Sequence, residues 1–220
     1  MPAVVEAWLP GEEGAEALVD VLMGDVNPSG RLPISVPRSV GQVPVYYGHK
    51  QSGGRSHWTG HYVDESAKPL YPFGHGLSYT QFHYTDLAFS NRVVDVHGCV
   101  DISCAIRNIG ARAGDEIVQL YIRDPEADVT RPIQELRGFA RVSLAAGAAA
   151  RVTFRLSAHQ LAFYNRSMQF VVEPGVVEVM VGASSEDIRL QGTFAVTGDT
   201  AEVGEEKVFT TPVEIQPLRD

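Results

Sequence analysis

Runs of alternating apolar and polar residues fill the chain from residue 82 onward, and they limit the fold more than any other feature. In residues 100–106 and again in 152–156, apolar side chains occupy every second position. Because successive side chains of a strand point to opposite faces, this pattern predicts strands with one buried face. Eight short strands separated by turn residues are typical of an antiparallel β-sandwich. The predicted strands are 84–89, 100–106, 117–122, 139–144, 152–156, 168–172, 176–181 and 188–196.

One predicted strand, residues 117–122, is apolar on both of its faces. Val118 and Leu120 share one face, while Ile117 and Tyr121 lie on the other. A strand with two apolar faces is covered on both sides, so we expect it to lie in the interior of its sheet.

The chain contains two cysteines, Cys99 and Cys104, which lie five positions apart in one predicted strand. An odd separation places them on opposite faces, so they cannot form a disulfide within that strand. They also lack the spacing of a zinc site. We expect Cys104 to act as a small buried apolar residue.

The first 38 residues follow a different pattern, that of a strand, a helix and a second strand. Residues 3–9 and 31–37 are short apolar runs, and the apolar spacing in 12–23 predicts a helix that stops at Gly24. About forty residues bury too little surface to offset their ordering entropy. This unit therefore needs a larger sheet, from a further part of the polypeptide or from another chain.

Residues 39–81 have no regular period but are rich in aromatic residues, histidine, glycine and proline. Long segments of this kind are functional or link domains, and the aromatic rings need a surface to cover. The rings can contact a glycan, whose C–H faces suit aromatic side chains, or they can join two domains. The candidates for either role are Tyr46, Tyr47, His57, Trp58 and Tyr62.

The charge balance argues against nucleic acid as a partner. The chain has 18 Lys and Arg against 27 Asp and Glu, a formal net charge of −9. An acidic surface repels a phosphate backbone. No apolar run is long enough for a transmembrane helix, and no signal peptide is visible, although one further upstream would not be seen. Localisation is therefore not predicted. Residues 198–220 are acidic and lack a core pattern, which predicts a surface tail.

No recognisable catalytic or metal-binding pattern emerges from the residues themselves. Adjacent carboxylates at 12–13, 64–65 and 205–206 are expected to be solvated, because glycosidase chemistry needs two carboxyl groups held across a sugar ring. His57 and His61 have a helical metal spacing, but Gly60 lies between them and no helix is indicated. We predict no catalytic residue, no metal and no cofactor.

Several motifs nevertheless resemble one known family, glycoside hydrolase family 3, in the order in which that family carries them. Residues 8–33 resemble the end of its α/β-sandwich domain, and residues 71–82 resemble the entry to its fibronectin type III-like domain. Further matching motifs cover residues 108–110, 114–121, 131–132, 135–139, 173–175 and 181–182. The resemblance extends to about Val196.

The resemblance implies a mainly β chain: an immunoglobulin or fibronectin III-like antiparallel sandwich, preceded by a short α/β remnant and a long aromatic-rich loop. It divides the chain into the α/β remnant (1–38), the linker loop (39–81), the fibronectin type III-like domain (82–197) and the acidic tail (198–220). Family members are mostly retaining β-glucosidases and β-xylosidases. The nucleophile is an aspartate of an N-terminal barrel, and the acid/base in the β-glucosidase type is a glutamate ahead of the segment resembling 8–33.

The chain is thus expected to be the C-terminal portion of a β-glucosidase-type hydrolase, inactive alone because both catalytic carboxylates lie elsewhere. Its expected partners are the barrel and the rest of the α/β-sandwich domain, with β-linked glucosides bound by the full enzyme. Without the barrel, residues 45–62 are expected to be poorly ordered. Two alternatives stay open: a stand-alone fibronectin-like binding module, which leaves residues 8–33 unexplained, and one half of a split glycosidase.

Overall fold

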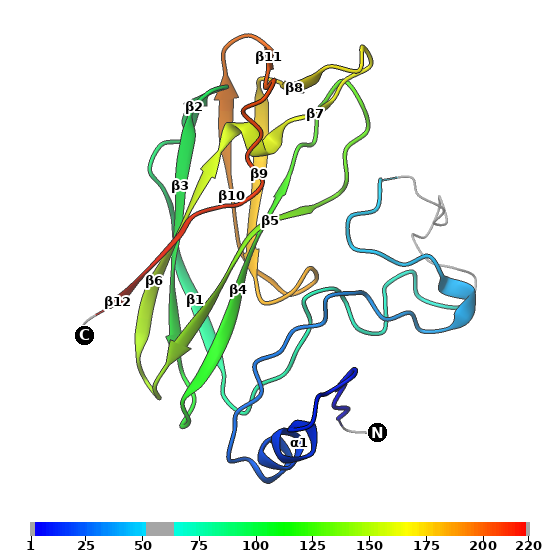
Figure 1. The fold of residues 1–220 in the computed structure, drawn as a ribbon. Helices are drawn as coiled ribbons and strands as arrows, with labels where there is room; N and C mark the ends of the chain where they lie inside the picture. The colour runs from blue at the N-terminus through cyan, green and yellow to red at the C-terminus, as the bar shows by residue number, and fades with distance from the viewer. Residues whose placement is uncertain (1–2, 52–63, 219–220) are drawn as a thin grey trace.

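The computed structural model describes residues 3–51 and 64–218, and its main body is a β-sandwich (Figure 1). A helix α1 (Gly14–Met23) and a 3-10 turn η1 (Val40–Gln42) precede it. The strands of the first half are β1 (Phe82–Phe89), β2 (Val93–Asp95), β3 (Cys99–Asn108), β4 (Gly114–Arg123), β5 (Glu135–Leu144) and β6 (Ala149–Ser157). The second half contains η2 (Ala158–Leu161), β7 (Phe163–Tyr164), β8 (Phe170–Val172), β9 (Gly175–Gly182), β10 (Ile188–Thr197), β11 (Ala201–Glu202) and β12 (Val213–Leu218).

Two sheets form the sandwich and a small third sheet lies at one end. The strand orders are β1-β3-β6-β12, β2-β10-β9-β4-β5 and β11-β8-β7. Neighbouring strands are antiparallel except for β2 and β10, which are parallel. The predicted mainly β fold, a fibronectin III-like sandwich, is confirmed.

The alternating pattern produces the core as predicted. Val100 and Ile102 of β3 and Val152 and Phe154 of β6 are buried between the sheets. Cys104 is buried there too, and burial raises the pKa of its thiol to about 12, so it stays protonated. Cys99 and Cys104 are both free, as expected.

Strand β4 is interior, between β5 and β9, as its two apolar faces predicted. Val118 and Leu120 face the core and are fully buried. Gln119 and Tyr121 are also buried, at 3% and 0% exposure. They are covered by the chain that precedes the sandwich, so this strand carries the contact between the two parts.

The N-terminal unit contains the predicted helix but not the predicted strands. Helix α1 ends at Gly24, whose φ of 87° is left-handed, as the sequence indicated. The prediction of a strand at 3–9 is wrong: these residues have no strand partner in the described chain, and Leu9 is 97% exposed. At 31–37 the predicted strand is reduced to one isolated bridge, between Val36 and Tyr71. A strand needs a neighbouring strand for its backbone hydrogen bonds. Among the described residues, 3–9 have no such neighbour, and 31–37 share backbone hydrogen bonds with residues 70–75 only at Leu32 and Val36.

The segment predicted as an acidic surface tail, 198–220, contains two strands that the sequence did not indicate. β11 pairs with β8, and β12 adds an edge strand beside β6, which Figure 1 shows in red. Val203 between them is buried at 4% exposure. The pairing of β12 uses backbone groups while most of its side chains stay exposed, which is why no core pattern marked it. None of the helices among the described residues could span a membrane.

Phe154 should be one of the most sensitive core positions. Its ring is fully buried between the sheets. We expect Phe154→Ala to lower the free energy of unfolding by about 3–5 kcal/mol through lost apolar contact and a cavity. The measurement is urea denaturation of the full chain. Phe139→Ala is the matched control, because Phe139 is 65% exposed and its removal should change stability by about 0.5 kcal/mol or less. Equal losses in the two variants would contradict this assignment of the core.

Candidate functional site: the junction of the N-terminal segment and the sandwich

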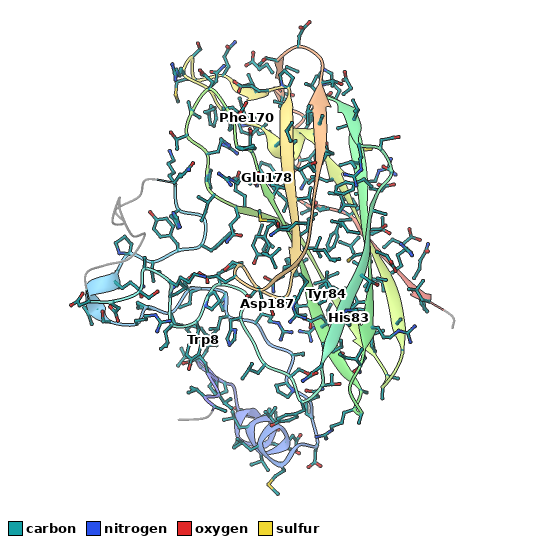
Figure 2. All side chains as sticks on the ribbon, turned by 180° about the vertical axis from the view of Figure 1, so that it is seen from behind. Trp8, His83, Tyr84, Phe170, Glu178 and Asp187 are labelled. Atoms are coloured by element: carbon teal, nitrogen blue, oxygen red, sulfur yellow. The ribbon has the colours of Figure 1, made fainter. Side chains whose placement is uncertain are left out.

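Residues 24–51 and 64–80 run along the lower end and one side of the sandwich and contact β4 and the β9–β10 loop (Figure 1). We call this contact surface the junction. Asp187, labelled in Figure 2, lies in the β9–β10 loop that faces these residues. The Ser185 N–H in the same loop donates to the carbonyl of Phe73 at 3.0 Å.

The side chain of Gln119 is the centre of the junction. Its Nε2 donates to the carbonyls of Gly74, at 3.2 Å, and Ala183, at 2.7 Å. Its Oε1 accepts from the Tyr121 hydroxyl at 2.6 Å. One buried amide therefore connects the N-terminal segment, β4 and the β9–β10 loop. Since each amide group has a partner, its burial is not penalised.

An ion pair joins the same two parts. Arg31 Nη2 lies 2.7 Å from Glu116 Oε1, with side-chain exposures of 9% and 6%. Glu116 Oε1 also accepts the backbone N–H of Ile117 at 2.8 Å. Burial, and then the Arg31 charge, lower the pKa of His75, which stacks on Tyr71. His75 therefore favours its neutral form beside the arginine.

Asn27 forms a third polar connection. Its Nδ2 donates to the carbonyl of Ala113 at 2.9 Å. Its Oδ1 accepts from the hydroxyl of Ser78 and the backbone N–H of Tyr79. The Tyr79 hydroxyl in turn donates to the carbonyl of Val21 in α1, at 2.6 Å. These bonds connect the helix, the entry to the sandwich and the β3–β4 loop.

The structure places the residues predicted to contact a glycan or a second domain in different surroundings. Tyr47 stacks on Phe73 with ring centroids 4.3 Å apart and meets Tyr121 edge-on at 5.7 Å. Tyr47 therefore acts in the junction, as the domain-contact interpretation proposes. Tyr46 is 57% exposed and lines a cavity of about 320 Å³ together with Lys68, Gln134 and other residues. His57, Trp58 and Tyr62 lie outside the described residues, as do the spacing of His57 and His61 and most of the loop expected to be poorly ordered.

A larger cavity, of about 540 Å³, lies under the β4–β5 loop. Its arginines are paired with carboxylates: Arg131 with Glu135 at 2.8 Å, and Arg166 with Asp128 at 3.3 Å. Burial raises the pKa of Asp124 in its wall. Within residues 3–51 and 64–218, no group of three or more His, Cys, Asp or Glu could hold a metal ion. The glycan contacts predicted for the aromatic and histidine residues of the loop stay a prediction.

Several residues of the junction lie in the family motifs, but the sequence alone assigned no role to them. The available signals were polar residues within otherwise apolar strands, such as Gln119, and the glycine of the 71–76 motif, Gly74. Gly74 has φ +80°, and a Cβ there would lie 2.1 Å from Gln119 Oε1. Polar positions inside a buried strand indicate contacts with another layer, which only the fold can identify.

The fold is that of a fibronectin type III-like domain with an N-terminal extension, and comparison with known proteins agrees. The family model described as "Fibronectin type III-like domain" matches residues 116–185. The model described as "Glycosyl hydrolase family 3 C-terminal domain" matches residues 1–79. The junction therefore lies between two segments that each match a domain of one family.

Curated relatives and solved structures match nearly the whole chain. A periplasmic β-glucosidase of Salmonella typhimurium is 42% identical over 198 residues, covering 87% of this chain and 26% of the relative. A β-xylosidase of Formosa agariphila is 40% identical over 186 residues, covering 84% and 26%. The β-glucosidase of Listeria innocua in complex with glucose is 37% identical with a TM-score of 0.82, covering 88% of this chain and 28% of that one.

These matches place the chain in glycosyl hydrolase family 3, where it corresponds to a C-terminal part. It spans about a quarter of the length of the curated relatives that it matches. The resemblance read from the motifs is confirmed.

Gly74 should tolerate no side chain, for two separable reasons. Gly74→Ala combines the cost of a left-handed backbone, about 1–2 kcal/mol, with displacement of the Gln119 amide from its partners. Gly147→Ala is the matched control, because Gly147 has φ +79° but nothing within 4 Å of the added Cβ. Urea denaturation should show a loss at least about 1 kcal/mol larger for Gly74→Ala. Equal losses would mean that the contact with Gln119 adds nothing.

The buried ion pair should matter far more than an exposed one. We expect Glu116→Ala to lower the free energy of unfolding by about 3–5 kcal/mol, because it leaves Arg31 buried and uncompensated. Asp115→Ala removes the partner of Arg141, whose side chain is 54% exposed, and should cost about 1 kcal/mol or less. Thermal and urea unfolding of both variants test the difference. A Glu116→Ala loss no greater than that of Asp115→Ala would contradict the assigned role.

Proposed function

We propose that this chain works as the C-terminal part of a retaining β-glucosidase-type enzyme that hydrolyses terminal β-D-glucosyl residues. The names of the similar proteins support this proposal. The relatives from Salmonella typhimurium and Listeria innocua are β-glucosidases, and the relative from Formosa agariphila is a β-xylosidase. The family resemblance adds the retaining mechanism and the β-linked substrate. The domain division at residues 38, 81 and 197 belongs to the same proposal, and the last segment contributes β12 to the sandwich and β11 to the small third sheet.

The observation that carries the proposal is the uncovered apolar surface of residues 4–26. Trp8 is 56%, Leu9 97% and Leu22 67% exposed. In Figure 2, Trp8 lies in the N-terminal segment, well away from the core residue Tyr84. Each exposed apolar Å² costs roughly 25 cal/mol relative to burial, and several large exposed apolar side chains within one short segment are typical of an interaction site.

The partner that fits this surface is the rest of an α/β-sandwich domain, which the N-terminal barrel precedes in family members. Helix α1 presents Val19, Leu22 and Met23 to solvent, although the helical spacing indicates a buried face. Residues 3–9 read as a buried strand but lie without a strand partner among the described residues. Both features are expected where a neighbouring sheet completes the unit, in the same polypeptide or in a separate chain.

The chain by itself should not hydrolyse glycosides. The resemblance assigns the nucleophile and the acid/base to the barrel and to the preceding part of the sandwich domain, and we transfer neither role to any residue here. The purified 220-residue chain should therefore show no turnover of an aryl β-glucoside above buffer, with a full-length family 3 β-glucosidase as the positive control. Turnover that is abolished by a substitution within the chain would contradict the prediction that the chain alone is inactive.

The DNA upstream of residue 1 distinguishes the possible contexts. An in-frame barrel coding region supports a single enzyme, and a neighbouring gene for a barrel supports a split enzyme. If neither is present, the proposal fails and a stand-alone module is favoured, which saturable glycan binding by the full chain would support. A split enzyme also predicts that adding the barrel-bearing chain restores aryl β-glucoside hydrolysis.

A further inference from the structure

Two histidines meet at the end of the sandwich farthest from the junction. His97 lies in the turn between β2 and β3, at the upper end of Figure 1, and His159 lies in η2. His97 Nδ1 is 3.2 Å from His159 Nε2, and the ring centroids are 5.5 Å apart at an interplanar angle of 83°. Neither residue belongs to the junction or to the family motifs.

The separation of the two nitrogens suits a shared metal ion. With metal–nitrogen bonds of about 2.0–2.1 Å, atoms 3.2 Å apart subtend roughly 100–106° at the ion, near the tetrahedral angle. The ion lies off the line that joins the nitrogens, so each ring must turn to aim its lone pair. His97 is exposed, which leaves its ring room to turn.

The second nitrogen of His159 already has the partner expected in a metal ligand. Nδ1 is 3.2 Å from the backbone carbonyl of Glu206, and because a carbonyl only accepts, Nδ1 must carry the proton. The lone pair of His159 is therefore on Nε2, facing His97. Metal-ligating histidines commonly donate their other N–H to a carbonyl in this way.

The surroundings hold the pair in place and carry negative charge. The backbone N–H of His97 donates to Asp95 Oδ1 at 3.0 Å, and the backbone N–H of Ala158 donates to the carbonyl of Gly98 at 2.9 Å. The Glu206 carboxylate lies 3.8 Å from His159 Nδ1 and is 80% exposed in its side chain. The carboxylates of Asp95 and Glu206 beside these two histidines, in a chain of net charge −9, favour a cation.

We propose that His97 and His159 chelate a zinc-class divalent transition metal ion, with water in the remaining positions. In the metal-free pair, His97 donates its Nδ1–H to His159. On binding, His97 carries its proton on Nε2 instead, so both rings stay neutral and each supplies one lone pair. The ion ties the β2–β3 turn to η2 and, through the Glu206 carbonyl, to the segment that leads into β12.

The test is calorimetric titration of the untagged full chain with zinc chloride. We expect saturable binding of one ion, weakened at least tenfold in His97→Ala and in His159→Ala. His83→Ala is the matched control: His83 is exposed on β1, toward the other end of the sheet, and is labelled in Figure 2. Circular dichroism checks that the variants fold. Binding that survives both variants, or no saturable binding by the parent chain, would overturn the proposal.

Two further readouts exclude other ligands. Cobalt(II) should give the weak visible bands of nitrogen and oxygen ligation, without the strong ultraviolet charge-transfer band that a Cys99 thiolate would add. In the variant His57→Ala/His61→Ala, zinc affinity should remain that of the parent chain. A thiolate band, or loss of binding in that variant, would assign the ion to another place and contradict the chelate.

Discussion

The burial of β4 on both faces is the constraint on which the rest of the structure depends. One face, with Val118 and Leu120, completes the core between the two sheets. The other face, with Gln119 and Tyr121, would be exposed in an isolated sandwich and is covered here by the preceding segment. The sandwich and its N-terminal extension therefore cover each other at this strand, and removing either one would expose surface that the other buries.

The junction is polar where it is buried, and this polarity makes it specific. A buried amide or ion pair stabilises only the arrangement that satisfies its hydrogen bonds, and leaves unpaired groups in every other. Gln119 has partners on three segments, and Arg31 meets Glu116 across the same surface. A purely apolar contact would have held the extension in several registers. Here the polar contacts favour the one register in which their hydrogen bonds are satisfied.

The apolar pattern of the sequence and the observed structure disagree at both ends of the chain, in opposite directions. Near the N-terminus, helix α1 has a regular apolar spacing, yet its Val19, Leu22 and Met23 are exposed. At the C-terminus, residues without a core pattern are structured, because the open edge of β6 offers backbone hydrogen bonds to β12. Apolar periodicity predicts which face of a segment can be buried. It does not predict pairing through backbone hydrogen bonds, because nearly every residue carries the same backbone donor and acceptor.

The sequence by itself determined the sandwich, because alternation along strands such as β3 and β6 allows only one buried face, and it determined the family through motifs around Asn27, Gly74 and Gly114. It also placed the helix and its end at Gly24. Only the tertiary structure decided what the polar motif residues do, and which aromatic rings lie in contact. Gln119 and Gly74 are 45 positions apart, and His97 and His159 are 62 apart. Such pairs come together through strand order and sheet twist, which local patterns do not encode.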